Sequence, residues 1–535
     1  MNILTTLICA GAICSAADTG TYTYTNPVLY TDYSDPDVIK DGEDYWMTSS
    51  SFNHVPGLQI LHSSNLVDWT VVNAALPRLT PEEDFATPSH GNAVWAPSIR
   101  RHDRMFYIFW GDPDRGIYYV KAENPAGKWS APHLVAEGKG MIDPCPLWDE
   151  DGRVWLVHGW AGSRAGFKSV LSVMELAPDC SRAIGPEILV FDGKSNGNPT
   201  VEGPKFYKRD GWYYIFAPAG GVKEGWQLVL RSRNVLGPYE YRKILHQGAT
   251  DIHGPHQGAW VEDAGGQHWF LHFEDRHAYG RVVHLQPMAW DEEGWCIIGK
   301  DIDGDGIGEP VSEHPYPKTM GPERIMDGPD ALERSDSFDT PYLSPIWQWP
   351  ANPSTGQFFL NPSEGFLRLI CRPLPDGARN LWDSPYILMR KLVGPSDSLT
   401  ATLRFHPSYD GDRAGIVVMG EDYAWIGIQY DKGKAYLKQA SCKDADKGEE
   451  ETETAREDIS SSLGKDGYIH IRLKVTIDST AVCRFSYSTG NGDFKVTGEE
   501  FTARAGRWVG AKVGIYTTAA TRKNDGGTLD VLNVE

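Results

Sequence analysis

Short apolar runs, many of them rich in aromatic and β-branched residues, follow one another through the first 310 residues of the chain. Glycine, aspartate and proline separate these runs, and no stretch shows convincing amphipathic helix spacing. The pattern predicts β-strands joined by turns. Five runs share an acidic or glycine turn followed by an aromatic strand: DGEDYWMTSS, RHDRMFYIFWG, DEDGRVWLVHG, KRDGWYYIFAP and DAGGQHWFLHF.

These five runs recur at a nearly constant interval. Their aromatic anchors are separated by 60, 49, 58 and 56 residues, and they are Trp46, Phe106, Trp155, Tyr213 and Trp269. A period near 50 residues, with a second strand visible inside the periods, is typical of a β-propeller in which each period forms one four-stranded blade. We therefore predict a five-bladed β-propeller over residues 18–313.

The composition changes after the propeller. Residues 314–334 are rich in proline and glycine, which predicts a connector. From residue 335 to residue 535 strands continue at short spacing without the propeller period, which favours a two-sheet β-sandwich. The acidic run KDADKGEEETETAREDISS within it is predicted to be a solvated loop. The predicted fold class is therefore all-β.

The composition of the whole chain excludes several classes of protein. Of its 535 residues 41% are hydrophobic and 23% charged, as in soluble globular proteins. The net charge of −21 repels nucleic acid and anionic lipid, so we expect neither as a partner. No apolar run beyond the N-terminus is long enough to span a membrane. Six cysteines follow residue 17 without framework spacing, and we expect isolated buried thiols.

The N-terminus has features of an export signal. MNILTTLICAGAICSAADTG has an apolar core followed by small residues, although it lacks the usual positive n-region. We predict a signal peptide over residues 1–17 and a secreted or periplasmic protein. The alternative is a buried N-terminal strand.

Polar and aromatic residues occupy one recurring position in the five periods. Eleven to thirteen residues before the successive anchors stand Asp35, Trp95, Asp143, Glu202 and His256. Equivalent positions of successive blades are related by rotation about the propeller axis, so we expect these side chains to converge at one end of the central channel. Any one of them alone would be interpreted as a turn or edge residue. Their recurrence in register predicts a site.

Three carboxylates among these residues indicate acid–base chemistry. In an enclosed site carboxylates repel one another and lose hydration, so the pKa of at least one should rise. A proton donor then stands beside a base. Cleavage of a glycosidic bond with inversion needs such a pair, with carboxyl groups about 6.5–9.5 Å apart.

Five motifs resemble a known family. NPVLYTDYSDPDVIKDGEDYWMTSSSF, WAPSIR, IDPCPLW, TVEGPKFYK and GPHQGAWV together look like glycoside hydrolase family 43, the five-bladed inverting β-xylosidases, α-L-arabinofuranosidases and arabinanases. RWVGAKVGIYTT and the strands before it are similar to the concanavalin-like sandwich of the family's xylosidase-type members. The resemblance covers nearly the whole chain.

The resemblance implies a role for each matched carboxylate. Asp35 would be the general base and Glu202 the general acid. Asp143 would be the third carboxylate, which orients the acid and favours its protonated form. Asp37 competes with Asp35 as the base, because strand alternation keeps both on one face. The family motif favours Asp35, since it places the base directly before the proline.

Further residues are expected near the substrate. The resemblance implies that Trp95 and Phe52 form walls of the −1 subsite and that Arg281 lies near the substrate and the carboxylates. His256 matches the family's axial histidine, and its alternative is a hydrogen-bonded core residue. Trp160 leaves a strand for a glycine-rich loop in HGWAGSRAG, which predicts that it lines a subsite.

One segment has half of a calcium-binding pattern. KDIDGDGIGEP places Asp301, Asp303 and Asp305 at alternate positions, as at the start of a calcium loop. Ser312 stands where the closing glutamate is required, and Glu309 is a substitute ligand. The segment is either a structural calcium site or a plain Asp-Gly turn. No cofactor is expected for the chemistry itself.

The sequence therefore predicts an inverting exo-glycosidase that removes terminal β-D-xylosyl or α-L-arabinofuranosyl residues from plant cell-wall oligo- or polysaccharides. One alternative is a retaining five-bladed hydrolase of the invertase type, although SDPDVI lacks the Asn-Gly that such enzymes show after the proline. The other alternative is a carbohydrate-binding propeller without catalysis, which would have no need of three mutually repelling carboxylates.

Overall fold

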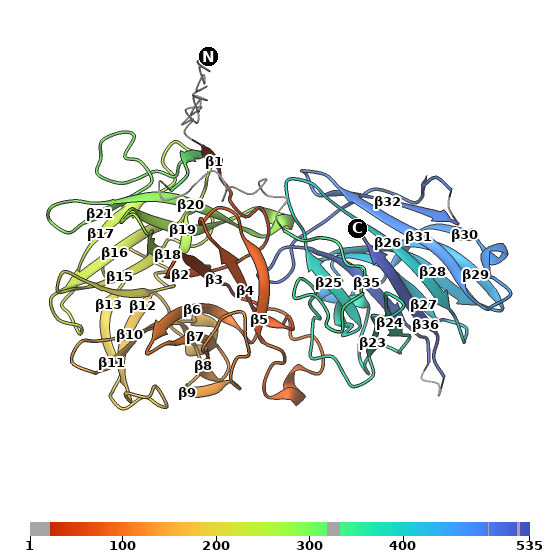
Figure 1. Ribbon diagram of the computed structural model, residues 1–535, viewed down its shortest axis with the longest axis horizontal. Helices are drawn as coiled ribbons and strands as arrows, with labels where there is room; N and C mark the ends of the chain where they lie inside the picture. The colour runs from red at the N-terminus through yellow and green to blue at the C-terminus, as the bar shows by residue number, and fades with distance from the viewer. Residues whose placement is uncertain (1–21, 318–331, 491, 522–524) are drawn as a thin grey trace, which may run out of the picture.

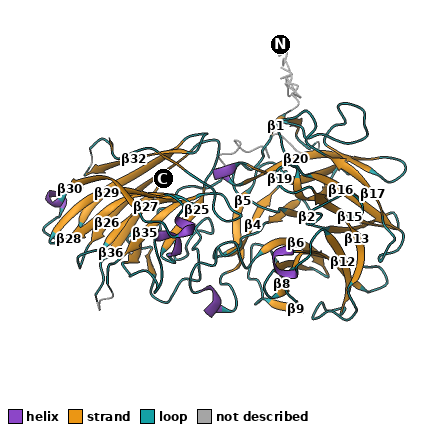
Figure 2. Ribbon diagram, turned by 180° about the vertical axis from the view of Figure 1, so that it is seen from behind, coloured by secondary structure: helices purple, strands orange, loops and turns teal. Residues whose placement is uncertain are grey.

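The computed structural model describes residues 22–317, 332–490, 492–521 and 525–535. Two domains built from strands lie side by side along the long axis (Figure 1). Helices in the described residues are single short turns (Figure 2), namely η1 (Glu82–Phe85), α1 (Gly162–Ala165), η2 (His277–Tyr279), η5 (Leu381–Asp383), η6 (Ala445–Lys447) and η7 (Ser460–Ser462). The predicted signal peptide and most of the predicted connector lie outside the described residues.

The first domain is a propeller of five four-stranded antiparallel blades, which confirms the predicted architecture. The first, innermost strands are β2 (Asp37–Asp41), β6 (Trp95–His102), β10 (Met141–Trp148), β14 (Lys205–Arg209) and β18 (His256–Glu262). The second strands are β3 (Asp44–Thr48), β7 (Met105–Asp112), β11 (Val154–Trp160), β15 (Trp212–Ala219) and β19 (His268–Asp275). The third strands are β4 (Gly57–Ser63), β8 (Gly116–Ala122), β12 (Val170–Leu176), β16 (Trp226–Ser232) and β20 (Arg281–Trp290). The outer strands are β5 (Thr70–Leu76), β9 (His133–Glu137), β13 (Ile188–Asp192), β17 (Glu240–Leu245) and β21 (Cys296–Ile298).

The aromatic anchors of the sequence lie on the second strands, which pack between neighbouring blades. All but the first residue of β7 are buried, as are most residues of β15 and β19. Outer strands such as β17 begin with exposed residues. A strand covered on both faces needs apolar side chains at nearly every position, which explains why these segments are continuous apolar runs instead of alternating ones.

The N-terminal segment closes the ring of blades against the fifth blade. β1 (Thr23–Thr25) pairs with β22 (Glu313–Pro315), which follows that blade. Further along, Leu29 and Val283 exchange backbone hydrogen bonds, and the Tyr33 N–H donates to the Arg281 carbonyl at 2.9 Å. This closure brings the start of the first blade beside Arg281, at the start of β20.

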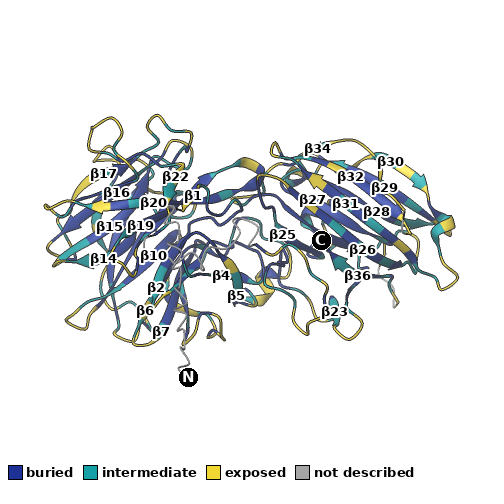
Figure 3. Ribbon diagram, turned by 45° about the horizontal axis from the view of Figure 1, so that its top comes forward, coloured by how far each residue is buried: buried dark blue, intermediate teal, exposed yellow. Residues whose placement is uncertain are grey.

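The second domain is a sandwich of two antiparallel sheets, as predicted. One sheet contains β23 (Phe358–Asn361), β24 (Phe366–Ile370), β36 (Thr528–Val534), β26 (Asp397–His406), β31 (Ile469–Ile477), β32 (Val482–Thr489), β33 (Lys495–Val496) and β34 (Phe501–Thr502). The other contains β25 (Ile387–Lys391), β35 (Lys512–Thr518), β27 (Arg413–Met419), β28 (Tyr423–Asp431), β29 (Lys434–Cys442) and β30 (Thr452–Asp458). The strand surfaces between the sheets are buried (Figure 3). The alternating burial along β26 and β31 matches one face packed inward.

The two domains share a buried interface. Val55 of the propeller and Trp349 of the sandwich exchange backbone hydrogen bonds of 2.8 and 2.6 Å. The Asn352 side chain bonds both backbone groups of Leu79. These contacts place one edge of the sandwich beside the first blade.

The acidic run of the sandwich is not the solvated loop that the sequence predicted. Its second half forms β30, and Glu451 turns inward to Arg413, with 2.7 Å between Oε2 and Nη1. The Glu451 Oε1 atom also accepts hydrogen bonds from the Tyr423 hydroxyl and the Trp425 indole N–H. Buried donors thus hold a carboxylate that composition alone assigned to solvent. The six cysteines of the described residues are free and buried, as expected.

Candidate active site

The innermost strands of the blades begin at one end of the propeller channel, and a cavity of about 130 Å³ opens there. We call it the axial cavity. Seven residues predicted from the sequence line it, namely Asp35, Phe52, Trp95, Asp143, Glu202, His256 and Arg281. Five lining residues were missed by sequence reasoning, namely Ala96, Ile142, Val222, Gln257 and Trp508. The blade register therefore brought together the set that it predicted.

The backbone is irregular where the carboxylates enter the channel. Asp35 and Asp143 have left-handed conformations with φ of 57° and 58°, which aspartate tolerates better than most residues. The pairing of β10 with β11 shifts register between Ile142 and Cys145, and the inner strands of two other blades shift similarly. Such bulges re-aim a side chain: one lies at Asp143, and the other two lie beside Trp95 and His256.

Asp35 lies among groups that stabilise a carboxylate. The hydroxyls of Ser34 and Ser50 both donate to its Oδ2 atom. The Arg281 Nη1 atom lies 3.7 Å from Oδ1 and also donates to the Ser34 hydroxyl. These contacts hold the Asp35 carboxyl group in one orientation at the cavity wall, as a general base that acts on water requires.

Asp37, the competing candidate for the base, points elsewhere. Its side chain is fully buried and does not line the axial cavity. The Oδ2 atom accepts the Ile99 N–H and an Arg100 N–H, both at 2.6 Å. A carboxylate occupied in this way cannot reach a water molecule in the cavity, so the geometry agrees with the choice of Asp35.

Asp143 forms the floor of the axial cavity beside Glu202. It is 2% exposed, and its Oδ2 atom accepts the Gly203 N–H at 2.7 Å. Burial, together with the charges of Glu202 and Asp35, raises the pKa of Asp143 well above its ordinary value, while the Gly203 N–H and Lys205 act in the opposite direction. The expected pKa rise among the carboxylates is therefore found at Asp143.

His256 contacts the predicted general acid directly. Its Nε2 atom lies 2.9 Å from the Glu202 Oε1 atom, and the ring is almost completely buried. The Nδ1 atom is buried without a hydrogen-bond partner among the described residues. The structure thus unites the two interpretations of this residue, because His256 is a hydrogen-bonded buried group and also lines the axial cavity.

Aromatic rings wall the axial cavity, and one comes from the other domain. Phe52 and Trp95 meet edge to face at 6.4 Å between ring centroids. Trp508 meets Trp95 at 6.5 Å and is 48% exposed, so it stands at the open end. A Cβ atom on Gly91 would lie 2.9 Å from the Trp508 ring, so this glycine lets the sandwich loop approach. No blade repeat links Trp508 to the propeller; it lies in RWVGAKVGIYTT, which indicated the sandwich domain and not a place in the site.

Trp160 is the one predicted substrate residue that does not line the axial cavity. Its indole N–H donates to the Ser172 hydroxyl at 2.8 Å, and its ring packs on Phe167 at 4.9 Å between centroids. Its role in a subsite stays a prediction.

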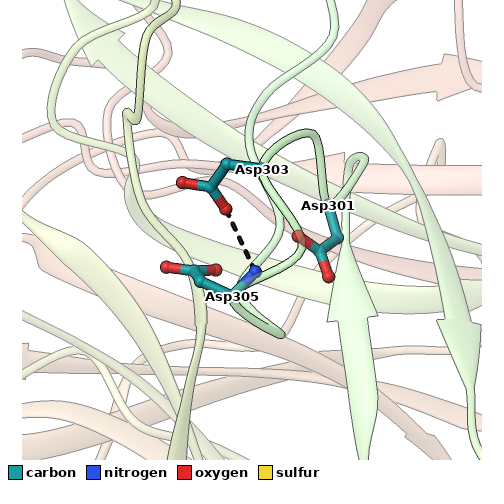
Figure 4. Close-up of side chains that lie close together, drawn as sticks. All are labelled: Asp301, Asp303 and Asp305. Carbon is teal, nitrogen blue, oxygen red and sulfur yellow. Dashed lines mark hydrogen bonds between the residues drawn. The ribbon is translucent and has the colours of Figure 1, made fainter.

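The acidic loop after β21 gathers three carboxylates away from the axial cavity (Figure 4). One oxygen from each of Asp301, Asp303 and Asp305 lies within 4.8 Å of the others. Backbone N–H groups of residues 304–307 already donate to all three side chains. Glu309 turns away, since it is buried and accepts the Ala249 N–H. Calcium binding stays a prediction that the loop geometry leaves untested.

The chain is similar to known proteins over almost its full length. The model of glycosyl hydrolases family 43 matches residues 24–296, and that of the beta xylosidase C-terminal concanavalin A-like domain matches residues 335–532. A putative beta-xylosidase of Xylanibacter ruminicola is 35% identical over 94% of this chain and 87% of that protein. A non-reducing end alpha-L-arabinofuranosidase of Bacteroides ovatus is 28% identical over 75% of this chain and 74% of that protein.

Solved structures share the two-domain fold. A xylan beta-1,4-xylosidase from Bacillus halodurans superposes with a TM-score of 0.80 at 23% identity, over 96% of this chain and 99% of that one. In the described residues no helix is long and apolar enough to cross a membrane. The two family models together span both domains, and the chain therefore belongs to glycoside hydrolase family 43.

Proposed function

We propose that the protein is an inverting exo-glycosidase that releases terminal β-D-xylosyl or α-L-arabinofuranosyl residues from plant cell-wall oligo- or polysaccharides. The observation that carries the proposal is the axial cavity, where three carboxylates meet aromatic walls in a space of about 130 Å³. A cavity of this size suits one terminal sugar ring better than the interior of a polymer. Relatives named as β-xylosidases and as an arabinofuranosidase support these two pentoses.

The proton transfers follow from the positions of the carboxyl groups. Glu202 donates its proton to the glycosidic oxygen. The bond from this oxygen to the anomeric carbon then breaks, and the leaving group departs with the oxygen. The Nε2 atom of His256 lies 2.9 Å from the Oε1 atom of Glu202 and orients this carboxyl group. Asp35 accepts a proton from the water that attacks the opposite face of the anomeric carbon. Asp143 accepts the Gly203 N–H and thereby fixes the peptide bond that follows Glu202.

The proposal is tested by hydrolysis of 4-nitrophenyl β-D-xyloside, 4-nitrophenyl α-L-arabinofuranoside and xylobiose. Glu202→Gln should lose most activity on xylobiose and less on the nitrophenyl glycosides, because nitrophenolate departs without a proton. Glu123→Gln, an exposed residue of the propeller, is the matched control and should keep wild-type rates. If the wild type hydrolysed none of these three pentosides, the proposal would be refuted.

The stereochemistry separates this mechanism from the invertase-type alternative. Proton NMR of the first-formed sugar should show the inverted anomer. A retained anomer would show that a carboxylate attacks the sugar directly, and Asp35 would then not be a base acting on water. A non-catalytic propeller would bind pentosides and release no sugar.

A further inference from the structure

A second set of residues lies beneath the axial cavity on the same inner strands. Asp37 and Cys145 each stand two residues beyond the catalytic carboxylates of β2 and β10, and Lys205 stands three beyond Glu202. Asp35 and Asp143 are left-handed and interrupt the regular alternation of side chains, so contacts between strands locate this second set: Lys205 of β14 reaches Pro97 and Ser98 of β6. The channel is therefore filled by successive layers, and the layer below the carboxylates is charged.

The layer consists of one carboxylate and two cations: Asp37 and Lys205 are fully buried, and the Arg100 side chain is 12% exposed. The Lys205 side chain is completely buried, and its Nζ atom donates to the Pro97 carbonyl at 2.6 Å and to the Ser98 hydroxyl at 3.0 Å. Nζ also lies 3.9 Å from the Asp37 Oδ1 atom. Arg100 bonds the other oxygen of Asp37 at 2.6 Å. We call Asp37, Arg100 and Lys205 the axial charge layer.

The axial charge layer is not neutral. One carboxylate against two cations leaves one positive charge: Arg100 bonds the Asp37 Oδ2 atom, and the Oδ1 atom is buried without a hydrogen-bond partner among the described residues. Buried charges are costly and add little stability, and apolar side chains would fill the channel at lower cost. Three carboxylates lie directly above this layer. A net positive charge beneath them offsets part of their mutual repulsion.

We propose that Lys205 is a positioning residue whose charge maintains the ionisation pattern of the catalytic carboxylates above it. The inference rests on the proposed function, since it assigns Lys205 to the acid–base machinery of that site. Lys205 is linked to Asp143 through its own strand segment, because Asp143 accepts the N–H of Gly203, two residues before Lys205. The charge of Lys205 lowers the pKa of Asp143, in opposition to the rise caused by burial, and this is the direction that the proposal requires.

Every inner strand contributes charged or titratable groups around Lys205. Those within or below the layer are Asp37 from β2, Arg100 from β6, Cys145 from β10 and Tyr207 from β14. Those above it, in the axial cavity, are Asp35, Asp143, Glu202, His256 and Arg281. Arg281 and His256 already contact Asp35 and Glu202. Among these cations, Lys205 lowers the pKa of Asp143 against the larger effect of burial.

The test is the pH dependence of kcat/KM in variants that change the layer's charge in opposite directions. Lys205→Gln removes a positive charge and should move the bell-shaped profile to higher pH by about one unit. Asp37→Asn removes a negative charge and should move it to lower pH. Ser98→Ala removes a hydrogen-bond partner of Nζ without changing charge, so its profile should stay in place even if the rate falls.

Opposite shifts support the proposal, whereas an unmoved profile in folded Lys205→Gln, or shifts of both variants in one direction, overturns it. If Lys205→Gln does not fold, Asp37→Asn alone decides by the sign of its shift. Carboxyl-carbon NMR titration, assigned with Asp143→Asn, supplies a readout that needs no turnover. A wild type without pentosidase activity would refute the proposed function, and the NMR titration would still test the axial charge layer.

Discussion

Replacing Trp508 by alanine tests whether the sandwich domain takes part in substrate binding. The ring stands at the open end of the axial cavity and is 48% exposed, whereas Asp143 at the floor is 2% exposed. A terminal sugar that reaches the carboxylates fills the inner end. The sugar that leaves must then lie toward Trp508. We therefore expect the variant to weaken binding on the leaving-group side of the substrate.

The expected magnitude follows from the exposed area of the indole. A large aromatic side chain buries about 150–250 Å² when covered, so roughly 100 Å² of Trp508 is available. A sugar ring that covers half of it removes about 50 Å² of apolar surface from water. At about 25 cal/mol per Å² this contributes about 1.3 kcal/mol, which corresponds to nearly a tenfold change in affinity.

The assay compares kcat/KM for xylobiose with inhibition by free xylose. Trp508→Ala should reduce kcat/KM for xylobiose about tenfold and leave xylose inhibition nearly unchanged, because free xylose occupies the inner end. Tyr342→Ala is the matched control, since Tyr342 is an exposed aromatic residue of the sandwich domain that does not line the axial cavity, and it should behave as wild type. Unchanged xylobiose kinetics would show that Trp508 does not contact the substrate, and equal losses for both sugars would indicate distortion of the whole site.

Three further predictions concern the carboxylates and the glycines around them. Asp143→Asn should abolish activity yet raise the Tm at pH 7. The folded pKa of Asp143 is raised above its ordinary 3.8, so the wild type loses stability as the pH rises from that value. A difference in Tm between variant and wild type that persisted at pH 3 would refute this cause. Gly203→Ala should lower stability by more than the about 1–2 kcal/mol of left-handed strain, since its Cβ would lie 2.6 Å from the Gln257 side chain, whereas Gly152→Ala, with open space around it, should show the strain alone in chemical denaturation. If the acidic loop binds calcium as predicted, calcium should raise the Tm of wild type and not that of Asp303→Asn, and equal melting curves would leave a plain turn.

The blade repeat explains why the carboxylates of the axial cavity could be predicted and why Trp508 was missed. One residue per period, in register, was enough to bring Asp35, Asp143 and Glu202 into one cavity, because rotation about the propeller axis converts equal spacing into proximity. Trp508 reaches the same cavity through the packing of one domain on another, and that packing follows no period. Glu451 was misjudged for a related reason, since its partner Arg413 lies on a strand 38 residues away.

The position of Asp37 shows how the repeat can be used at finer resolution. A period near 50 residues locates the catalytic layer, and the two-residue period of each strand then predicts the layer beneath it. Asp37 and Cys145 stand two residues beyond Asp35 and Asp143, and the contacts of Asp37 with Arg100 and Lys205 place this competitor for the base in the second layer. Lys205 stands three residues beyond Glu202, and Gly203 between them has a left-handed conformation with φ of 56°. The Gly203 N–H bonds Asp143, and Lys205 reaches Pro97 and Ser98 across the channel, so one short segment joins the axial cavity to the axial charge layer.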